Sequence, residues 1–230
     1  MILMIELTIP KKKMILLLLA GILGCLCMGG SDWLMIYGDT AFEGSLAWLT
    51  LGVAQIPAWR NGVAMLLAFP AVILYSLGLF GLRHFFSDDH TRKTYSFLTA
   101  LGMTPWLCLH LFYVMILALF AWLMGQGETE LAYAAGEMLF KNLGWVVMLG
   151  QILMILPFGY LFWIVFSGRS DYPGWAAVNN PLFIYLVLKV LVGLLPDTPF
   201  RLAFINGLMS ESMLIFFVIH LICVARSSNE

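Results

Sequence analysis

The sequence contains few charged residues for its length. Of 230 residues, 11% are charged and 62% are hydrophobic, whereas soluble domains have about 25% charged and about 45–50% apolar residues. So little charge cannot cover the surface of a water-soluble globule of this size, and the mean hydropathy of +0.94 agrees. The composition therefore predicts an integral membrane protein that crosses the bilayer several times.

Other absences exclude particular functions. The formal net charge of −1 gives no reason to expect nucleic-acid binding, and the 4 cysteines lie in apolar runs that indicate no disulfide framework. The motifs HExxH of metalloproteases, GxSxG of serine hydrolases and TVGYG of potassium channels are missing. No second histidine and no carboxylate lies three or four residues from His110 or His220, so we expect no metal site on a single helix. Ligands from several helices remain an alternative, but we expect no metal and no cofactor.

Six apolar segments are long enough to cross a bilayer, whose core of about 30 Å needs roughly 20 helical residues. The predicted spans are residues 14–34, 61–82, 95–124, 143–166, 176–195 and 202–224. The third span exceeds the membrane thickness, so we expect it to tilt strongly or to bend at Pro105. The sequence thus predicts an all-α, polytopic bundle of six transmembrane helices that forms a single domain over residues 1–230.

Two further apolar segments are too short to span the membrane. Residues 40–59 contain Trp48 and Trp59, which are typical of the headgroup interface, so we expect an interfacial or re-entrant helix there. A seventh full span is the alternative. Residues 131–142 include Glu137 and Lys141, and we expect this segment to lie on the external surface as a second short helix.

Lysine and arginine are distributed unevenly among the predicted loops, and such an excess marks the cytoplasmic side. With the N-terminus inside, the cytoplasmic segments contain Lys11, Lys12, Lys13, Arg83, Arg92, Lys93, Arg169 and Arg226. The opposite side contains only Arg60, Lys141 and Arg201. Six spans then place both termini in the cytoplasm.

The N-terminal region permits a second interpretation. Three lysines precede an apolar stretch that ends in Ile22-Leu23-Gly24-Cys25, which resembles a bacterial lipoprotein signal with Cys25 as the lipidated residue. Apolar residues continue beyond this cysteine, however. We therefore expect the first helix to be retained as a span.

Ionisable side chains inside the membrane are costly and so attract attention as candidate functional groups. Lys189 lies roughly 12 Å, and Glu211 roughly 18 Å, from the external turn between the last two predicted spans. An ion pair between them is geometrically possible, and Asn206 lies near the level of the lysine. Alternatively, Lys189 extends outward along its own helix.

Polar residues also gather at the external end of the predicted bundle. Asp32 lies at the end of the first span and Arg60 opens the second, so an ion pair that fixes these helices to each other is expected, with Arg201 as another candidate partner. His110 shares one face of the third span with Tyr113. If the external groups converge with Asn206, Glu211, His110 and Lys189, they form a cavity that opens outward.

The segment Gly30-Ser31-Asp32-Trp33-Leu34, followed by Arg60 at the start of the second span, resembles small bacterial integral membrane proteins with six helices and unknown function. The resemblance covers the layout of the whole chain. It implies a location in the bacterial cytoplasmic membrane and carries no known activity.

Three functions fit these observations. The favoured hypothesis is a membrane protein that binds a lipid or small amphiphile in an outward-open cavity, with Asp32, Arg60, His110, Lys189, Asn206 and Glu211 as candidate ligand-binding residues. The second is an assembly or interaction subunit whose charges are structural, in a homo- or hetero-oligomer. The third is a proton-coupled transporter that uses Glu211. Membrane lipid is an expected partner in each case.

Overall fold

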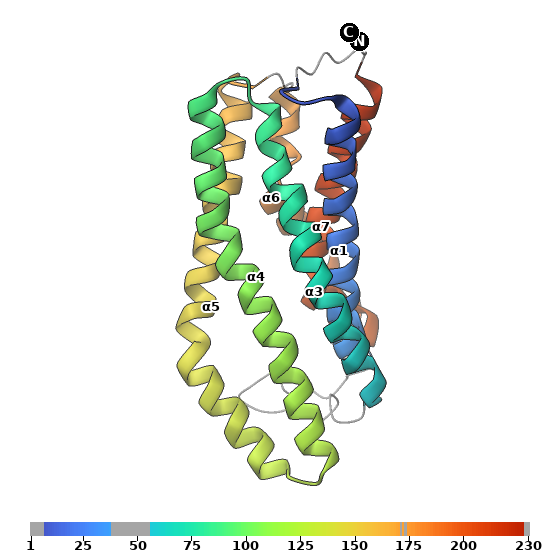
Figure 1. The fold of residues 1–230 in the computed structure, drawn as a ribbon. Coiled ribbons are helices and arrows are strands. Elements are labelled where there is room, and N and C mark those ends of the chain that lie inside the picture. Colours follow the sequence, from blue (N-terminus) through green and yellow to red (C-terminus); the bar gives the residue numbers. More distant parts are fainter. Residues whose placement is uncertain (1–6, 38–55, 171, 173, 228–230) are drawn as a thin grey trace.

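The computed structural model describes residues 7–37, 56–170, 172 and 174–227, and all regular structure in these residues is helical. The helices run up and down beside one another as an elongated bundle (Figure 1). The five long helices are α1 (Lys11–Ile36), α3 (Ala58–Gly81), α4 (Asp89–Gly125), α5 (Thr129–Phe166) and α7 (Pro199–Arg226). The shorter elements are the 3-10 helices η1 (Leu82–Phe85) and η2 (Gly174–Val178) and the α-helix α6 (Pro181–Gly193).

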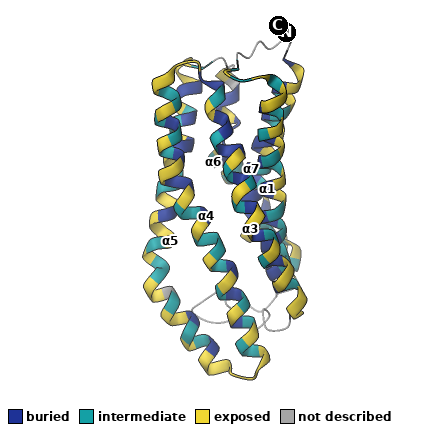
Figure 2. Ribbon diagram, viewed as in Figure 1, coloured by how far each residue is buried: buried dark blue, intermediate teal, exposed yellow. Residues whose placement is uncertain are grey.

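Five helical segments of the described residues are long and apolar enough to cross a membrane: Lys11–Ile36, Ala58–Phe85, Asp89–Gly125, Lys141–Phe166 and Pro199–Arg226. Large apolar side chains are exposed along the outer faces of these helices, while the buried residues face other helices (Figure 2). Contiguous apolar surface of this extent is expected where lipid is the solvent. Helix length, composition and surface thus agree with a multi-pass membrane protein.

The fifth predicted span, residues 176–195, is not confirmed as a full crossing. Its first residues form η2, and α6 contains only 13 residues, which gives about 20 Å of helix against a core of about 30 Å. The helix starts late because Asn180 caps it, accepting a hydrogen bond from the Leu182 amide, and Pro181 occupies the first turn. It ends at Gly193, ahead of Pro196.

The expected external short helices have different outcomes. Residues 131–142 do not form a separate surface helix, because they are the beginning of the continuous helix α5. Asn142 donates a hydrogen bond to the Met138 carbonyl within that helix, and Lys141 pairs with Glu137 one turn earlier, so polar side chains do not interrupt it. Residues 38–55, most of the other segment, lie outside the described residues, and Trp59 belongs to the first turn of α3.

The two longest helices, α4 and α5, form an antiparallel hairpin and continue through internal prolines. Pro105 lies inside α4 and Pro157 inside α5. The helices meet closely there, because a Cβ added to Gly102 would lie 2.5 Å from the Leu153 carbonyl oxygen and 3.0 Å from Pro157 Cδ. Both helices change direction along their length (Figure 1). The hairpin therefore bends as one unit, as the excess length of the third predicted span suggested.

The tightest packing joins α1 to α3 and α7. A Cβ on Gly24 would lie 2.4 Å from the Tyr75 amide nitrogen, and one on Gly78 would lie 2.5 Å from Gly21 Cα. Only glycine permits the two backbones to approach this closely. Small residues have this use in membrane proteins, where lipid removes the hydrophobic drive for association and leaves packing to hold helices together.

The beginning of α1 and the end of α7 lie at the same end of the bundle. The Lys11 ammonium donates hydrogen bonds to the carbonyl oxygens of Ala225, at 3.1 Å, and Ser227, at 2.6 Å. Thr8 Oγ1 lies 2.9 Å from His84 Nδ1, which places η1 there too. We call this the basic end, since the helix termini that meet there carry Lys11, Lys12, Lys13, Arg83, Arg92, Lys93, Arg169 and Arg226.

Candidate functional site

A cavity lies between α4, α5 and α7, beside the last turns of α1, and has a volume of about 390 Å³. Its walls are mostly apolar. Each helix contributes a stripe of side chains with helical spacing: Trp106, His110 and Tyr113 come from α4, and Leu143, Val147 and Gln151 come from α5. Residues spaced three or four apart lie on one face of a helix, so one face of each helix is turned toward the same space.

The polar edge of the cavity is formed by Asp32 of α1 and His110 of α4. Asp32 Oδ1 lies 3.7 Å from His110 Nδ1, and each side chain is only 8% exposed. This distance is too long for a hydrogen bond. His110 Nε2 is buried with no hydrogen-bond partner in the described part of the chain. A buried imidazole nitrogen beside a buried carboxyl group therefore has unused hydrogen-bonding capacity at the edge of an apolar cavity, which normally indicates that water or a ligand completes the site.

Three polar side chains from α5 and α7 add to this lining: Gln151, Asn206 and Ser210. Asn206 also donates a hydrogen bond to the Leu202 carbonyl in its own helix, at 2.9 Å. Gln151 and Asn206 are exposed on facing helices, as is Val147. We call these three residues the mouth, because they mark where the cavity opens at the surface of the bundle between α5 and α7.

The cavity lies far from the basic end. Lys13 and Asp32 are 19 residues apart on α1, and Arg92 and His110 are 18 residues apart on α4; at 1.5 Å per residue both separations are about 30 Å. That length equals the thickness of a bilayer core. The polar edge therefore lies about one bilayer-core thickness away from the basic end.

Glu211 is close to this site without lining it. Its Oε1 accepts a hydrogen bond of 2.8 Å from the Trp33 indole, while its Oε2 is buried and has no hydrogen-bond partner among the described residues. The carboxyl group lies over Gly207, where a Cβ would be only 2.6 Å from Oε1. Trp33 and Glu211 therefore join α1 to α7 by a side-chain bond adjacent to the cavity.

The predicted ion pair between Asp32 and Arg60 is wrong. Arg60 instead donates hydrogen bonds to the carbonyl oxygens of Trp33, at 3.2 Å, and Tyr37, at 2.9 Å. These acceptors lie in the last turn of α1 and at its C-terminal cap, Tyr37. Arg201, the other candidate partner of Asp32, pairs with Asp197 one turn earlier.

Lys189 does not pair with Glu211. Its side chain is exposed on α6, with the ammonium 5.9 Å from the centre of the Tyr185 ring. The structure thus agrees with the alternative in which the lysine extends along its own helix. Of the six candidate residues, Asp32, His110 and Asn206 line one cavity, and Arg60, Lys189 and Glu211 do not.

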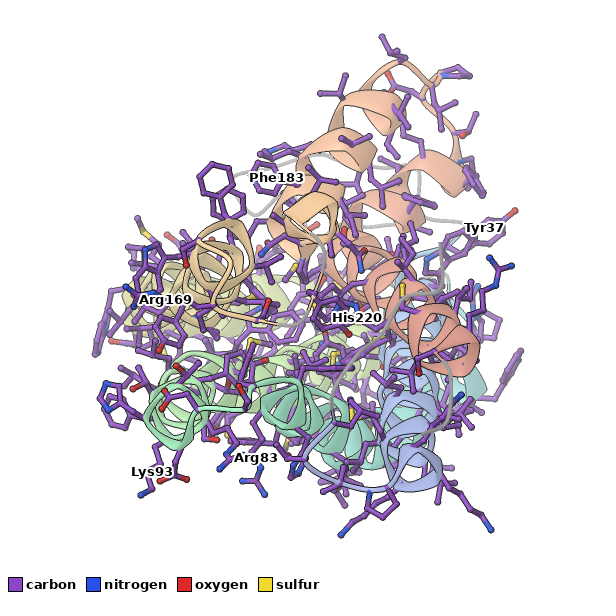
Figure 3. All side chains as sticks on the ribbon, turned by 90° about the horizontal axis from the view of Figure 1, so that it is seen from above. Tyr37, Arg83, Lys93, Arg169, Phe183 and His220 are labelled. Carbon is purple, nitrogen blue, oxygen red and sulfur yellow. The ribbon has the colours of Figure 1, made fainter. Side chains whose placement is uncertain are left out.

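A second buried polar cluster lies nearer the basic end. His220 Nδ1 is 2.9 Å from the Asn179 amide nitrogen and 2.9 Å from the Phe216 carbonyl oxygen. Asn180 donates a hydrogen bond to the Phe158 carbonyl. Figure 3 shows His220 inside the bundle, with Lys93 and Arg169 at the rim. These contacts connect η2 to α5 and α7, which matches the structural role expected for a histidine bound to a neighbouring element.

Sequence reasoning missed several residues of the site. Gln151 and Ser210 are uncharged, so a search for ionisable groups within the spans passes over them, although a glutamine inside an apolar run is itself a signal. The bond between Trp33 and Glu211 has no sequence signal. Among the described residues, no three His, Cys, Asp or Glu side chains gather closely enough to hold a metal ion.

The model of a family of unknown function (DUF6796) matches residues 4–227. The chain belongs to this family. The match covers nearly the whole chain, so the bundle and its cavity lie within the region that defines the family. Comparison with curated proteins and with solved structures gave no match.

Proposed function

We propose that this member of the family binds a lipid or small amphiphile in the cavity between α4, α5 and α7. The observation that carries the proposal is that one cavity combines mostly apolar walls with a polar edge. At that edge Asp32 lies beside His110, whose Nε2 has no hydrogen-bond partner among the described residues. Amphiphiles have the same division into an apolar body and a polar head. The volume of 390 Å³ falls within the range of about 300–1,000 Å³ that is usual for ligand pockets.

The position of the mouth supports entry from the lipid. Val147, Gln151 and Asn206 are exposed, and α5 packs mainly on α4 while α7 packs on α1 and α6. The opening between α5 and α7 therefore faces sideways. An amphiphile could enter it without its apolar body leaving the bilayer, which avoids the cost of exposing apolar surface to water.

The distribution of charge supports an orientation. Eight of the 12 lysines and arginines belong to the basic end, and an excess of these residues marks the cytoplasmic side. We therefore place both chain ends in the cytoplasm and the cavity near the outer border of a bacterial inner membrane. The bacterial location follows from the resemblance of the segment containing Asp32 to small bacterial membrane proteins.

The test is native mass spectrometry of the protein released from mild detergent, with identification of the small molecules that leave it. We expect a stoichiometric amphiphile with the unaltered protein and loss of that molecule in Leu143→Trp, which fills the cavity. Met148→Trp is the matched control, because Met148 lies on α5 with 66% exposure and does not line the cavity. Equal retention by both variants, or a bare protein that keeps only partner chains, would overturn the proposal and favour an assembly subunit.

Transport by proton coupling receives less support from the geometry. Glu211, the candidate proton carrier, does not line the cavity and is bonded to Trp33. Toward the basic end, His220 and Asn179 contact each other. A path across the membrane would need polar groups in both halves, so ligand binding fits the described residues better than transport.

A further inference from the structure

The charge of the cavity lining is one-sided. Asp32 contributes a carboxyl group, whereas none of the described residues that line the space is a lysine or arginine. The other polar lining groups are an imidazole, amides and hydroxyls. A ligand with a negatively charged head would meet no lysine or arginine among these described residues and would lie close to a carboxyl group.

Among the residues that the structure describes, Asp32 also has no strong partner. Its carboxylate oxygen is 3.7 Å from His110 Nδ1, and the two nearby arginines are otherwise engaged, Arg60 with main-chain carbonyls and Arg201 with Asp197. An ionised carboxylate in apolar surroundings is costly unless it is paired. A cation supplied by the ligand would provide the missing pair.

Aromatic rings that line the same cavity as this carboxyl group strengthen the preference. Trp106, Phe112 and Tyr113 line the cavity from α4, and the Trp106 ring is stacked near His110 with 6.4 Å between centroids. The face of an aromatic ring attracts a cation, and aromatic surroundings are a general way to recognise alkylated ammonium groups. A carboxylate beside aromatic faces in an apolar space is a site for an amphiphilic cation.

We infer that the ligand of this cavity is an amphiphilic ammonium compound, an organic amine or quaternary ammonium with an apolar body, whose charged head lies against Asp32. This inference rests on the proposed function and specifies its ligand class. The cavity of 390 Å³ holds about a dozen groups of water size at ~30 Å³ each, enough for a head and a substantial part of one chain. The ammonium could come from a single-chain amine or from the headgroup of a zwitterionic phospholipid.

The experiment compares probes of equal chain length and opposite charge. The full-length protein in dodecyl maltoside is titrated with dodecyltrimethylammonium and with dodecanoate, each below its micellar concentration, and bound probe is counted by native mass spectrometry. We expect the ammonium probe to bind at least tenfold more tightly than dodecanoate. Asp32→Asn should weaken ammonium binding at least tenfold, whereas the matched variant Asp89→Asn, at a surface ion pair of the basic end, should leave it unchanged.

Two further arms keep the outcomes distinct. Asn206→Lys places a cation at the mouth, where the side chain is already exposed, and should shift preference toward dodecanoate even if Asp32→Asn does not fold. Release of co-purified phosphatidylethanolamine by the ammonium probe would identify a lipid headgroup as the source of the ammonium. Equal binding of both probes, or tighter binding of dodecanoate, would overturn the inference and leave amphiphile binding intact. Absence of any bound amphiphile would overturn both.

Discussion

Substituting Gly24 by alanine should separate α1 from α3. The new Cβ would lie 2.4 Å from the Tyr75 amide nitrogen and 2.8 Å from Tyr75 Cα, whereas non-bonded carbon atoms prefer about 3.5–4.0 Å. The atoms that the new Cβ would meet belong to the backbone, so no side-chain rotation relieves the contact. The helices must move apart by about 1 Å, which forfeits much of the dispersion energy along their interface. We expect a loss of about 1–3 kcal/mol in the free energy of unfolding, as for other overpacked cores.

The control is Gly159→Ala, in the interior of α5, where a Cβ would meet no atom of the described structure within 4 Å. Replacing glycine by alanine inside a helix without a clash stabilises it by roughly 0.5–1 kcal/mol. Both variants are measured by denaturation in mixed micelles, followed by circular dichroism. Gly24→Ala with stability equal to or above that of Gly159→Ala would refute the close approach of α1 and α3.

Three further predictions concern individual contacts. Asn180→Ala removes the cap of α6 and the bond to a main-chain carbonyl of α5, so mixed-micelle denaturation should show a loss of about 1–3 kcal/mol; an unchanged midpoint would contradict the capping role. Trp33→Phe leaves Glu211 Oε1 without its donor and should cost about 1–3 kcal/mol in the same assay, whereas Trp59→Phe, at an exposed indole, should have no effect. In a cysteine-free background, Gln126→Cys at the turn between α4 and α5 should react in intact cells with a thiol reagent that does not cross membranes; reaction only after lysis would reverse the proposed orientation.

The long helices could be predicted from the sequence because membrane insertion depends on hydropathy, which adds up over consecutive residues of the chain. A run of about 20 apolar residues is recognisable wherever its partners lie. The beginning of α5 was not recognisable in this way, since Glu137, Lys141 and Asn142 interrupt the apolar run in residues 131–142. Glu137 and Lys141 pair with each other along the exposed side of the helix, so the helix continues where the hydropathy signal stops.

The cavity was predicted only in part, since depth can be read from a sequence but helix rotation cannot. Counting residues placed Asp32 and Arg60 at one level, which is correct, and suggested that they pair. Rotation decides otherwise, because Asp32 is turned toward His110 while Arg60 reaches the carbonyls at the end of α1. The arginine donates its hydrogen bonds to main-chain carbonyls at the helix end. It therefore does not pair with the buried carboxyl group, although the two residues lie at one level.

The short helix α6 explains why the cavity has an opening at all. Asn180 fixes its beginning to α5 at Phe158, and beyond that point α6 packs mainly on α7. Figure 3 shows α6 and the first turns of α7 leaning away from the other helices. The mouth residue Val147 lies 11 residues before Phe158, about 16 Å farther along α5, where α6 has already moved away. At about 20 Å, α6 is long enough to reach this level, so it is the packing of α6 on α7 and not on α5 that leaves the mouth uncovered.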